Sequence, residues 1–200
     1  MGPMPHRRSE PADVGGAEVR GDRILASNSG RCVEESYQTA YNLGCGSRHW
    51  PGWINVDLAP DADIRSDLRH LDAIPSDSAD AVAAIHVLEH FHEWEALPLI
   101  EEWKRVLKPG GKMILELPCL NKICYYVAKS VRDKLPLDET MLLHPLFGSP
   151  KGQDPLMGHK WGYFKETLRA LLERAGMRDI QFVTPRYHFP MRDMRVECVK

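Results

Sequence analysis

Two glycines, Gly44 and Gly46, follow directly after a short apolar segment in the stretch NLGCG (42–46). Because glycine has no Cβ, the backbone at both positions can bend sharply and approach a ligand closely. The next apolar segment, WINVDL (53–58), contains a lone acid, Asp57, near its end. In sheets that bind nucleotides, an acid at the end of the second strand accepts hydrogen bonds from ribose hydroxyls. The glycines and the acid together predict a site for a ligand that contains a ribose.

The residues after Gly46 argue against a dinucleotide as that ligand. A dinucleotide fingerprint needs a third glycine for close packing of helix and strand, and a helix N-terminus to hold the pyrophosphate. The chain continues instead with SRHWPGW (47–53), in which Pro51 interrupts any such helix. An NAD-dependent oxidoreductase is therefore disfavoured. S-adenosylmethionine fits better, since it has a ribose, an adenine and a charged amino-acid tail but no phosphate.

Histidines and a glutamate gather in a third stretch, HVLEHFH (86–92). The spacing HxxEH also occurs in zinc peptidases, but that motif requires one continuous helix. Here His86 falls at or before the turn that follows a buried strand, so the peptidase interpretation is disfavoured. One alternative is that Glu89 and His90 stabilise the following helix, and another is that His90 lines a substrate pocket. We expect His92 to be exposed.

A scaffold of alternating strands and helices must position these residues. The stretch ADAVAAIHV (79–87) is an almost continuous apolar run, which is typical of a strand buried on both faces of a parallel sheet. The predicted strands are 39–44, 53–58, 79–87, 112–118, 180–185 and 194–200. We expect the last two to pair antiparallel. This order predicts an α/β fold with a Rossmann-like doubly wound sheet, mostly parallel with a C-terminal antiparallel strand.

Two amphipathic helices are predicted between these strands. In the first, apolar residues recur at spacings of three or four before the helix breaker KPGG (108–111). These residues are Trp94, Leu97, Ile100, Trp103 and Leu107. Because Pro98 would disrupt a helix interior, we expect the regular helix to begin there, with the proline in its first turn. The second helix is KETLRALLERAGM (165–177), where Gly176 can supply a left-handed C-terminal residue.

The chain is predicted to consist of a flexible N-terminal segment, residues 1–36, and a single domain, residues 37–200. Residues 1–36 are rich in Gly, Pro, Arg and Glu and show no apolar period. Within the domain, residues 120–162 fit neither the helical nor the strand period well, but they contain several aromatic side chains. Long insertions of this kind are commonly lids or binding loops. Residues 120–162 are therefore predicted to form an inserted substrate cap.

Four motifs together resemble the class I S-adenosylmethionine-dependent methyltransferases, and more closely a subgroup of the type 11 methyltransferase domains. The motifs are NLGCG (42–46), GWINVDL (52–58), HVLEHF (86–91) and RVLKPGG (105–111). The resemblance implies that S-adenosylmethionine is bound by Asn42, Gly44, Cys45, Gly46, Asp57, Leu58, Asp67, Leu68 and His86. It implies that the glycine turn follows the methionyl part of the cofactor and that Asp57 binds the ribose. His86 would border the reacting methyl group.

The resemblance also assigns roles around the adenine and the ammonium of the cofactor. Asp67 would accept a hydrogen bond from the adenine amino group, and Leu68 would pack near the ring. The alternatives are a solvated loop acid for Asp67 and plain packing for Leu58 and Leu68. Many members of the family carry Asp or Glu where Asn42 stands, and a neutral amide makes a weaker contact with the ammonium.

Methyl transfer is an in-line displacement that mainly requires the acceptor to be held against the methyl carbon. A base is needed only when the acceptor must lose a proton, and a neutral histidine can serve near neutral pH. The candidate catalytic residues are His86, His90 and His159, with His144 as a further candidate base. We expect a small-molecule or sugar acceptor. The main alternative is a methyltransferase-like protein that binds S-adenosylmethionine without catalysis.

Some methyltransferases hold magnesium at this place through an ExxEH motif and a later histidine. This sequence resembles that arrangement with His86 in place of the first glutamate, and His144 or His159 would supply the later ligand. Loss of a carboxylate disfavours magnesium, because that ion prefers oxygen ligands. We therefore expect no metal site, with Mg²⁺ dependence as the less favoured alternative.

Composition limits the partners. The net charge of −2 argues against general binding to nucleic acid or to anionic membranes. The five cysteines are odd in number and lack the paired spacing of zinc knuckles, which favours reduced thiols. Residues 1–22 lack the apolar segment of a signal peptide, and no apolar run is long enough to span a bilayer. We expect a cytoplasmic protein, and the sequence does not indicate its oligomeric state.

Overall fold

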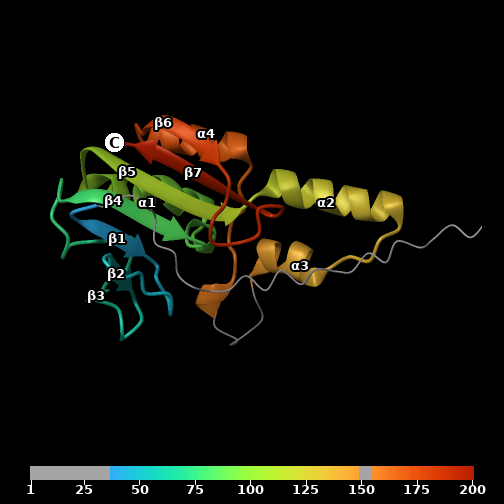
Figure 1. Cartoon of the computed structure of the whole chain (residues 1–200), viewed down its shortest axis with the longest axis horizontal. Coiled ribbons are helices and arrows are strands. Elements are labelled where there is room, and N and C mark those ends of the chain that lie inside the picture. The colour runs from blue at the N-terminus through green and yellow to red at the C-terminus, as the bar shows by residue number, and fades with distance from the viewer. Residues whose placement is uncertain (1–36, 149–154) are drawn as a thin grey trace, which may run out of the picture. The chain divides into compact units, whose positions relative to one another are not determined.

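A computed structural model describes residues 37–148 and 155–200, so the predicted flexible segment 1–36 lies outside the described residues. The strands in this part are β1 (Ala40–Leu43), β2 (Ile54–Asp57), β3 (Ile64–Arg65), β4 (Ala79–Ile85), β5 (Leu107–Pro118), β6 (Arg178–Val183) and β7 (Asp193–Val199). They form a seven-stranded sheet in the order β3-β2-β1-β4-β5-β7-β6 (Figure 1). Neighbouring strands are parallel from β3 to β5, whereas β7 pairs antiparallel with both β5 and β6. The predicted Rossmann-like, mostly parallel sheet with an antiparallel C-terminal strand is confirmed.

The first long helix begins earlier than predicted. The helices of the described part are η1 (Leu88–His90), α1 (Glu93–Val106), α2 (Leu120–Asp133), α3 (Glu139–Phe147), η2 (Pro155–Met157) and α4 (Lys165–Arg174). Helix α1 begins at Glu93 and contains Pro98 in its interior, because the Glu95 carboxylate accepts the backbone N–H of His92 at 2.8 Å and caps the helix start. Pro98 is exposed, so water can bind the carbonyl of Trp94, to which the proline nitrogen cannot donate a hydrogen bond.

The stretch KPGG (108–111) is part of strand β5, whereas the predicted strand began at Lys112. Pairing with β4 passes from Ala79 opposite Leu107 to Ala81 opposite Lys112, so the extra residues form a bulge. Helix α1 thus ends at Val106 and β5 begins at Leu107 without a separate loop between them, and the glycines lie within the bulge.

The predicted cap, residues 120–162, contains more regular structure than was predicted. Helices α2 and α3 occupy much of it, although no helical period was recognised there. In α2 only Ile123 and Ser130 are buried, while the apolar Tyr125 and Val131 remain exposed. The sequence of α2 is nevertheless strongly amphipathic at the helical period, so the pattern was present and was overlooked. No helix of the described part is both long and apolar enough to cross a membrane.

The two faces of the sheet are covered differently. Helices α1 and α4 pack on one face, against inward-facing strand residues such as Leu43 and Val82. The buried cluster on the other face contains Trp50 and Trp53, with Tyr187 packed against it, and no helical residue among those described. The rings of Trp50 and Tyr187 stack with their centroids 4.7 Å apart. Aromatic side chains from loops therefore close the face that borders the glycine turn.

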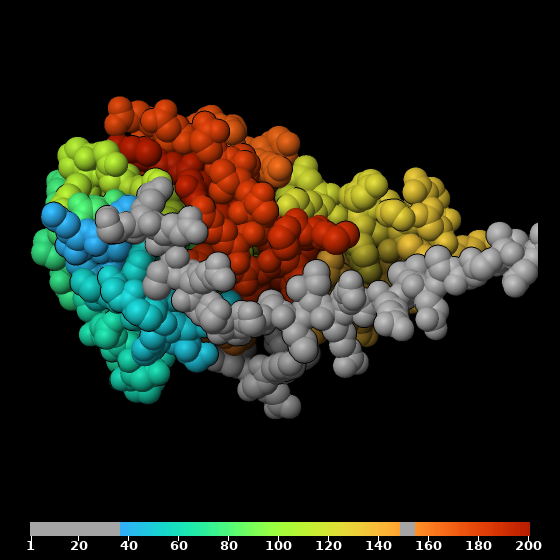
Figure 2. All heavy atoms as spheres, in the orientation of Figure 1, coloured from blue at the N-terminus to red at the C-terminus, as the bar shows by residue number. Residues whose placement is uncertain are grey.

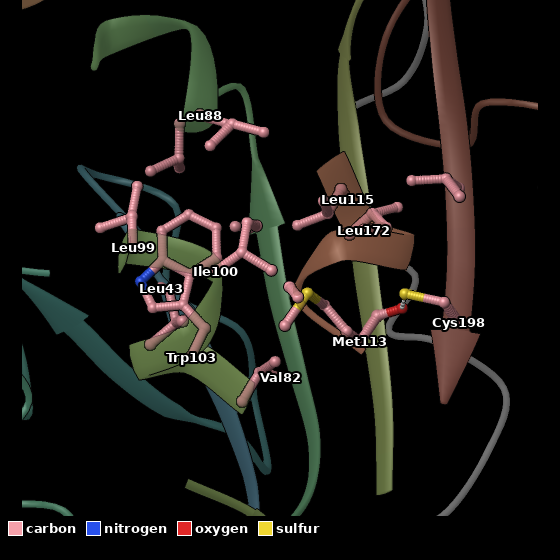
Figure 3. Close-up of a cluster of buried hydrophobic side chains, with 14 of the residues drawn as sticks. Leu43, Val82, Leu88, Leu99, Ile100, Trp103, Met113, Leu115, Leu172 and Cys198 are labelled. Carbon is pink, nitrogen blue, oxygen red and sulfur yellow. Dashed lines mark hydrogen bonds between the residues drawn. The ribbon is translucent and has the colours of Figure 1, made fainter. Parts of the chain in front are cut away.

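Trp103 of α1 lies at the centre of the helical face. It is fully buried beside Leu99 and Ile100 (Figure 3). Its indole N–H donates to the carbonyl oxygen of Leu68 at 3.0 Å. Trp103 therefore holds α1 against the segment after β3 that contains Leu68.

The loop between β6 and β7, residues 184–192, is held over the end of the sheet by a buried acid. The backbone N–H groups of residues 186–188 donate to the carboxylate of Glu116, each at 2.9 Å. Lys122 of α2 donates to the carbonyl oxygen of Pro190 at 2.7 Å. Figure 2 shows this red segment between the blue-to-cyan N-terminal strands and the yellow α2. The loop thus connects the sheet to the cap.

Replacing Trp103 with alanine is expected to lower the free energy of unfolding by about 3–5 kcal/mol, because it removes a fully buried side chain and leaves a cavity. The matched control is Trp94→Ala in the same helix, where the side chain is 72% exposed. Its effect should stay within about 0.5 kcal/mol. Urea unfolding of both variants measures the difference. Equal losses would contradict the assigned core.

Candidate active site

The turn NLGCG follows β1 and has the backbone conformation that glycine permits. Gly44 has φ +68° and Gly46 has φ +50°, both in the left-handed region. The backbone N–H of Gly44 donates to the carbonyl oxygen of Val56 at 2.8 Å. A Cβ on Gly44 would lie 2.5 Å from a methyl of Val87, just after β4. The turn therefore packs directly between the ends of β2 and β4, where no side chain fits.

Asp57 joins the end of β2 to this turn. One carboxylate oxygen accepts the backbone N–H of Gly46 at 2.8 Å, and the other accepts that of Ala59 at 2.9 Å. The side chain is half-buried. Since a carboxylate offers about four lone-pair positions, Asp57 retains capacity to accept further hydrogen bonds, such as those of ribose hydroxyls.

Asn42 has a structural role that sequence reasoning missed. It is 3% exposed, and its amide nitrogen donates to the carbonyl oxygen of Arg48 at 2.9 Å and to the side-chain oxygen of Asn55 at 3.0 Å. Asn55 also accepts the backbone N–H of Trp50 at 2.8 Å. Both amide hydrogens of Asn42 are thus used to hold the loop after the glycine turn, and its oxygen is the atom suited to meet an ammonium.

The adenine-side candidates lie in different surroundings. Leu68 is buried and packs 3.4 Å from where a Cβ of Gly44 would lie, whereas Leu58 is 49% exposed. Asp67 accepts from the backbone N–H of Arg69 at 2.9 Å and pairs with its guanidinium at 3.0 Å. An adenine amino group would therefore have to share the Asp67 carboxylate with Arg69.

Cys45 is buried within the turn. Burial and the nearby Asp57 carboxylate raise the pKa of its thiol to about 11. The thiol is therefore protonated at neutral pH and contributes packing rather than a nucleophile.

The crevice beside the glycine turn is small. It encloses about 30 Å³ between Asn42, Gly44, Cys45, Arg48, Trp50, Ile85 and Tyr187. Typical small-molecule sites enclose several hundred Å³. A Cβ on Gly46 would meet no atom within 4 Å. A ligand the size of S-adenosylmethionine would therefore extend over the open side of the turn, and the turn and Asp57 fit its methionyl and ribose parts.

His86 directly follows β4 with φ +56°. Its ring nitrogens lie 3.1 Å from a Glu89 oxygen and 3.5 Å from an Asp193 oxygen. Burial disfavours a charge on the ring, but the two carboxylates outweigh burial and raise the pKa of His86 to about 9. At neutral pH the ring is therefore an imidazolium, which has no lone pair to accept a proton. The catalytic role of His86 stays a prediction, and in this state it is one of charge and position.

Asp193 and His188 belong to the site but were not expected. Burial opposes ionisation of Asp193, yet hydrogen bonds from His86 and Arg192 lower its pKa to about 2. The His188 ring lies 3.9 Å from that of His86, and burial together with the His86 and Arg48 cations lowers the pKa of His188 to about 3. His188 lies in the irregular loop 184–192, and Asp193 is the first residue of β7, just before the predicted strand 194–200.

A second cluster forms where the cap meets the turn after His86. Glu89 is 1% exposed, and His159 of the cap places a ring nitrogen 3.9 Å from a Glu89 oxygen. The rings of His90 and His159 meet edge to face, with their centroids 4.8 Å apart. The backbone N–H of Lys160 donates to the Glu89 carbonyl at 2.8 Å. The structure thus brings together the three predicted catalytic histidines.

A cavity of about 310 Å³, here called the cap cavity, opens beside this cluster. Its lining includes Glu89, Leu120, Pro145, Phe147, His159 and Trp161. A larger cavity of about 510 Å³ lies between α1 and α4, but none of the predicted site residues lines it. The cap cavity is therefore the better candidate for an acceptor site.

Comparison with known proteins agrees with this geometry. Residues 43–115 match a family model described as "Methyltransferase domain". That range runs from the end of β1 into β5 and includes the glycine turn, Asp57 and the His86 turn. A search of curated proteins gives no match.

Solved structures share the fold. A SAM-dependent methyltransferase from Archaeoglobus fulgidus is 16% identical, with a TM-score of 0.54 over 81% of this chain and 86% of that one. One from Methanosarcina mazei is 15% identical, with a TM-score of 0.54 over 84% and 94%. The 1,6-didemethyltoxoflavin-N1-methyltransferase of Burkholderia thailandensis, solved with its substrate and S-adenosylhomocysteine, is 14% identical, with a TM-score of 0.52 over 81% and 70%. Residues 43–115 are thus similar to a methyltransferase domain, and the chain shares the fold of S-adenosylmethionine-dependent methyltransferases.

Proposed function

We propose that the protein transfers a methyl group from S-adenosylmethionine to a small molecule bound in the cap cavity. One observation carries the proposal: residues on either side of His86 in the chain line the crevice beside the glycine turn and the cap cavity. Ile85 lines the crevice and Glu89 lines the cap cavity. His86 lies between them in the chain and contacts Glu89 at 3.1 Å. A methyl group held at the end of β4 would thus lie next to an acceptor in the cap.

S-adenosylmethionine supplies an electrophilic methyl carbon when bound, and the protein's main task is to align an acceptor with it. The glycine turn and Asp57 would hold the methionyl and ribose parts. The His86 imidazolium, fixed by Glu89 and Asp193, would border the reacting methyl group and leave the acceptor free to contact it. The cap would exclude water and orient the acceptor lone pair toward the methyl carbon.

The lining of the cap cavity indicates the kind of acceptor. Leu120, Pro145, Phe147 and Trp161 offer apolar and aromatic surface, while Glu89, His159 and Lys160 contribute polar groups. Pockets of this composition bind a mostly apolar body and orient it through a few polar contacts. We therefore favour an apolar or aromatic small molecule with one polar reacting group over a sugar.

Asp57→Ala is expected to weaken S-adenosylmethionine binding about 10- to 100-fold, because charge-assisted hydrogen bonds to the ribose are lost. Calorimetric titration measures the affinity. Asp61→Ala is the matched control, since Asp61 lies in the same loop region with a side chain that is 66% exposed. Unchanged affinity in Asp57→Ala would rule out the ribose assignment.

Turnover is tested by following S-adenosylhomocysteine release by mass spectrometry in panels of aromatic alcohols, amines and carboxylic acids. Phe147→Ala is expected to lower kcat/KM for an accepted compound at least tenfold while leaving S-adenosylmethionine affinity unchanged, because Phe147 lines the cap cavity and not the crevice beside the glycine turn. Val131→Ala, an exposed change in α2, is the control. Tight cofactor binding without turnover across the panels would favour a non-catalytic binding protein.

A further inference from the structure

Glu89, His90 and His159 gather atoms that can hold a metal ion. One ligand atom from each residue lies within 4.8 Å of the other two. Among the described residues, Oε2 of Glu89 and Nδ1 of His90 are buried and have no hydrogen-bond partner. Leaving such groups buried without a partner is costly. A cation bound between them would remove that cost.

The orientation of the His159 ring also supports a bound metal ion. Its Nδ1 lies 2.9 Å from the carbonyl oxygen of Pro145. A carbonyl can only accept, so Nδ1 carries the hydrogen and Nε2 is directed toward Glu89. A hydrogen bond from the outer ring nitrogen to a carbonyl is the arrangement that orients histidines as metal ligands.

The spacing between His159 and Glu89 also suits an ion. Nε2 of His159 is 3.9 Å from Oε1 of Glu89, which is too long for a hydrogen bond. Two metal bonds of about 2.1 Å hold their ligand atoms about 3 to 4 Å apart. The observed separation lies at the upper end of that interval.

A neighbouring cluster is a poorer metal site. His86, His188 and Asp193 also lie within 4.8 Å of one another. However, Asp193 is engaged by the Arg192 guanidinium at 2.9 and 3.0 Å, and a guanidinium nitrogen of Arg48 lies 3.0 Å from Nε2 of His188. Two guanidinium groups thus occupy this cluster, whereas Glu89 faces the His86 ring through Oε1 alone and its Oε2 has no partner in the described part of the chain.

We propose that Glu89, His90 and His159 bind a divalent transition-metal ion. Two imidazoles and one carboxylate suit Zn²⁺, Mn²⁺ or Co²⁺ better than Mg²⁺, which prefers oxygen ligands. The proposal departs from the expectation of no metal site, because the sequence could not show that His159, rather than His144, meets Glu89.

The place of the site indicates what the ion would do, and this step rests on the proposed function. Glu89 and His159 line the cap cavity, so coordination positions left open by three protein ligands would face an acceptor. The site therefore selects acceptors with an oxygen donor, such as a phenol or an enol. The acceptor hydroxyl would release its proton to water more readily beside the ion. Its oxygen would then bond to the methyl carbon, and the pair of the broken C–S bond would stay on sulfur.

The test uses the untagged full-length chain, stripped with a chelator and titrated with Co²⁺ and with Zn²⁺. Visible absorption and calorimetry are expected to report one ion per chain with micromolar or tighter affinity. His159→Ala should lower the affinity at least tenfold. His144→Ala, in the same cap, and His92→Ala, beside η1, should leave it unchanged. Equal affinity in His159→Ala and the parent chain would overturn the proposal.

Glu89→Gln keeps the shape of the side chain and guards against misfolding of a histidine variant. It should lose Co²⁺ absorption while unfolding in urea as a single transition. S-adenosylmethionine binding is measured on the same samples. In the parent chain, cofactor binding without metal binding would overturn the metal site alone, whereas metal binding without cofactor binding would overturn the proposed function.

Discussion

Three buried carboxylates at the carboxyl end of the sheet impose the constraint on which the site depends. Glu89, Glu116 and Asp193 are 1%, 1% and 0% exposed. An ionised carboxylate in such surroundings is tolerated only where hydrogen bonds or opposite charges compensate it. His86 contacts both Glu89 and Asp193, and the loop 184–192 gives three backbone N–H groups to Glu116. The segments that form the site are thus held together by the charges they compensate.

The cap depends on the same charges. Arg192 binds Asp193 and also donates to the carbonyl oxygen of Thr140 in α3 at 3.1 Å. Lys122 of α2 donates to the backbone carbonyl of Asp193 at 2.5 Å. Both long helices of the cap are therefore connected to the first residue of β7. The proposed acceptor side and the proposed cofactor side of the site thus share one electrostatic support.

Features that depend on neighbours along the chain could be predicted from the sequence. An apolar run predicts strand β4, and two residues without side chains predict the glycine turn. Contacts between distant residues leave no such period. In the sequence Glu116 is a single polar residue in an apolar strand, and its partners at 186–188 lie in an irregular loop. His159 could be named as a candidate, but its orientation by Pro145 required the fold.

Strand β7 lies between β5 and β6, although it follows both in the sequence. On the ribosome β5 and β6 emerge first, so the edge of β5 keeps unpaired backbone groups until β7 is made. Asp193 opens that same strand, and the carboxylate that faces His86 arrives with it. Until β7 is made, a nascent chain thus has an open edge on β5, and His86 lacks one of its two carboxylate partners. The interval between the synthesis of β6 and that of β7 is therefore a stage at which the sheet is exposed to aggregation.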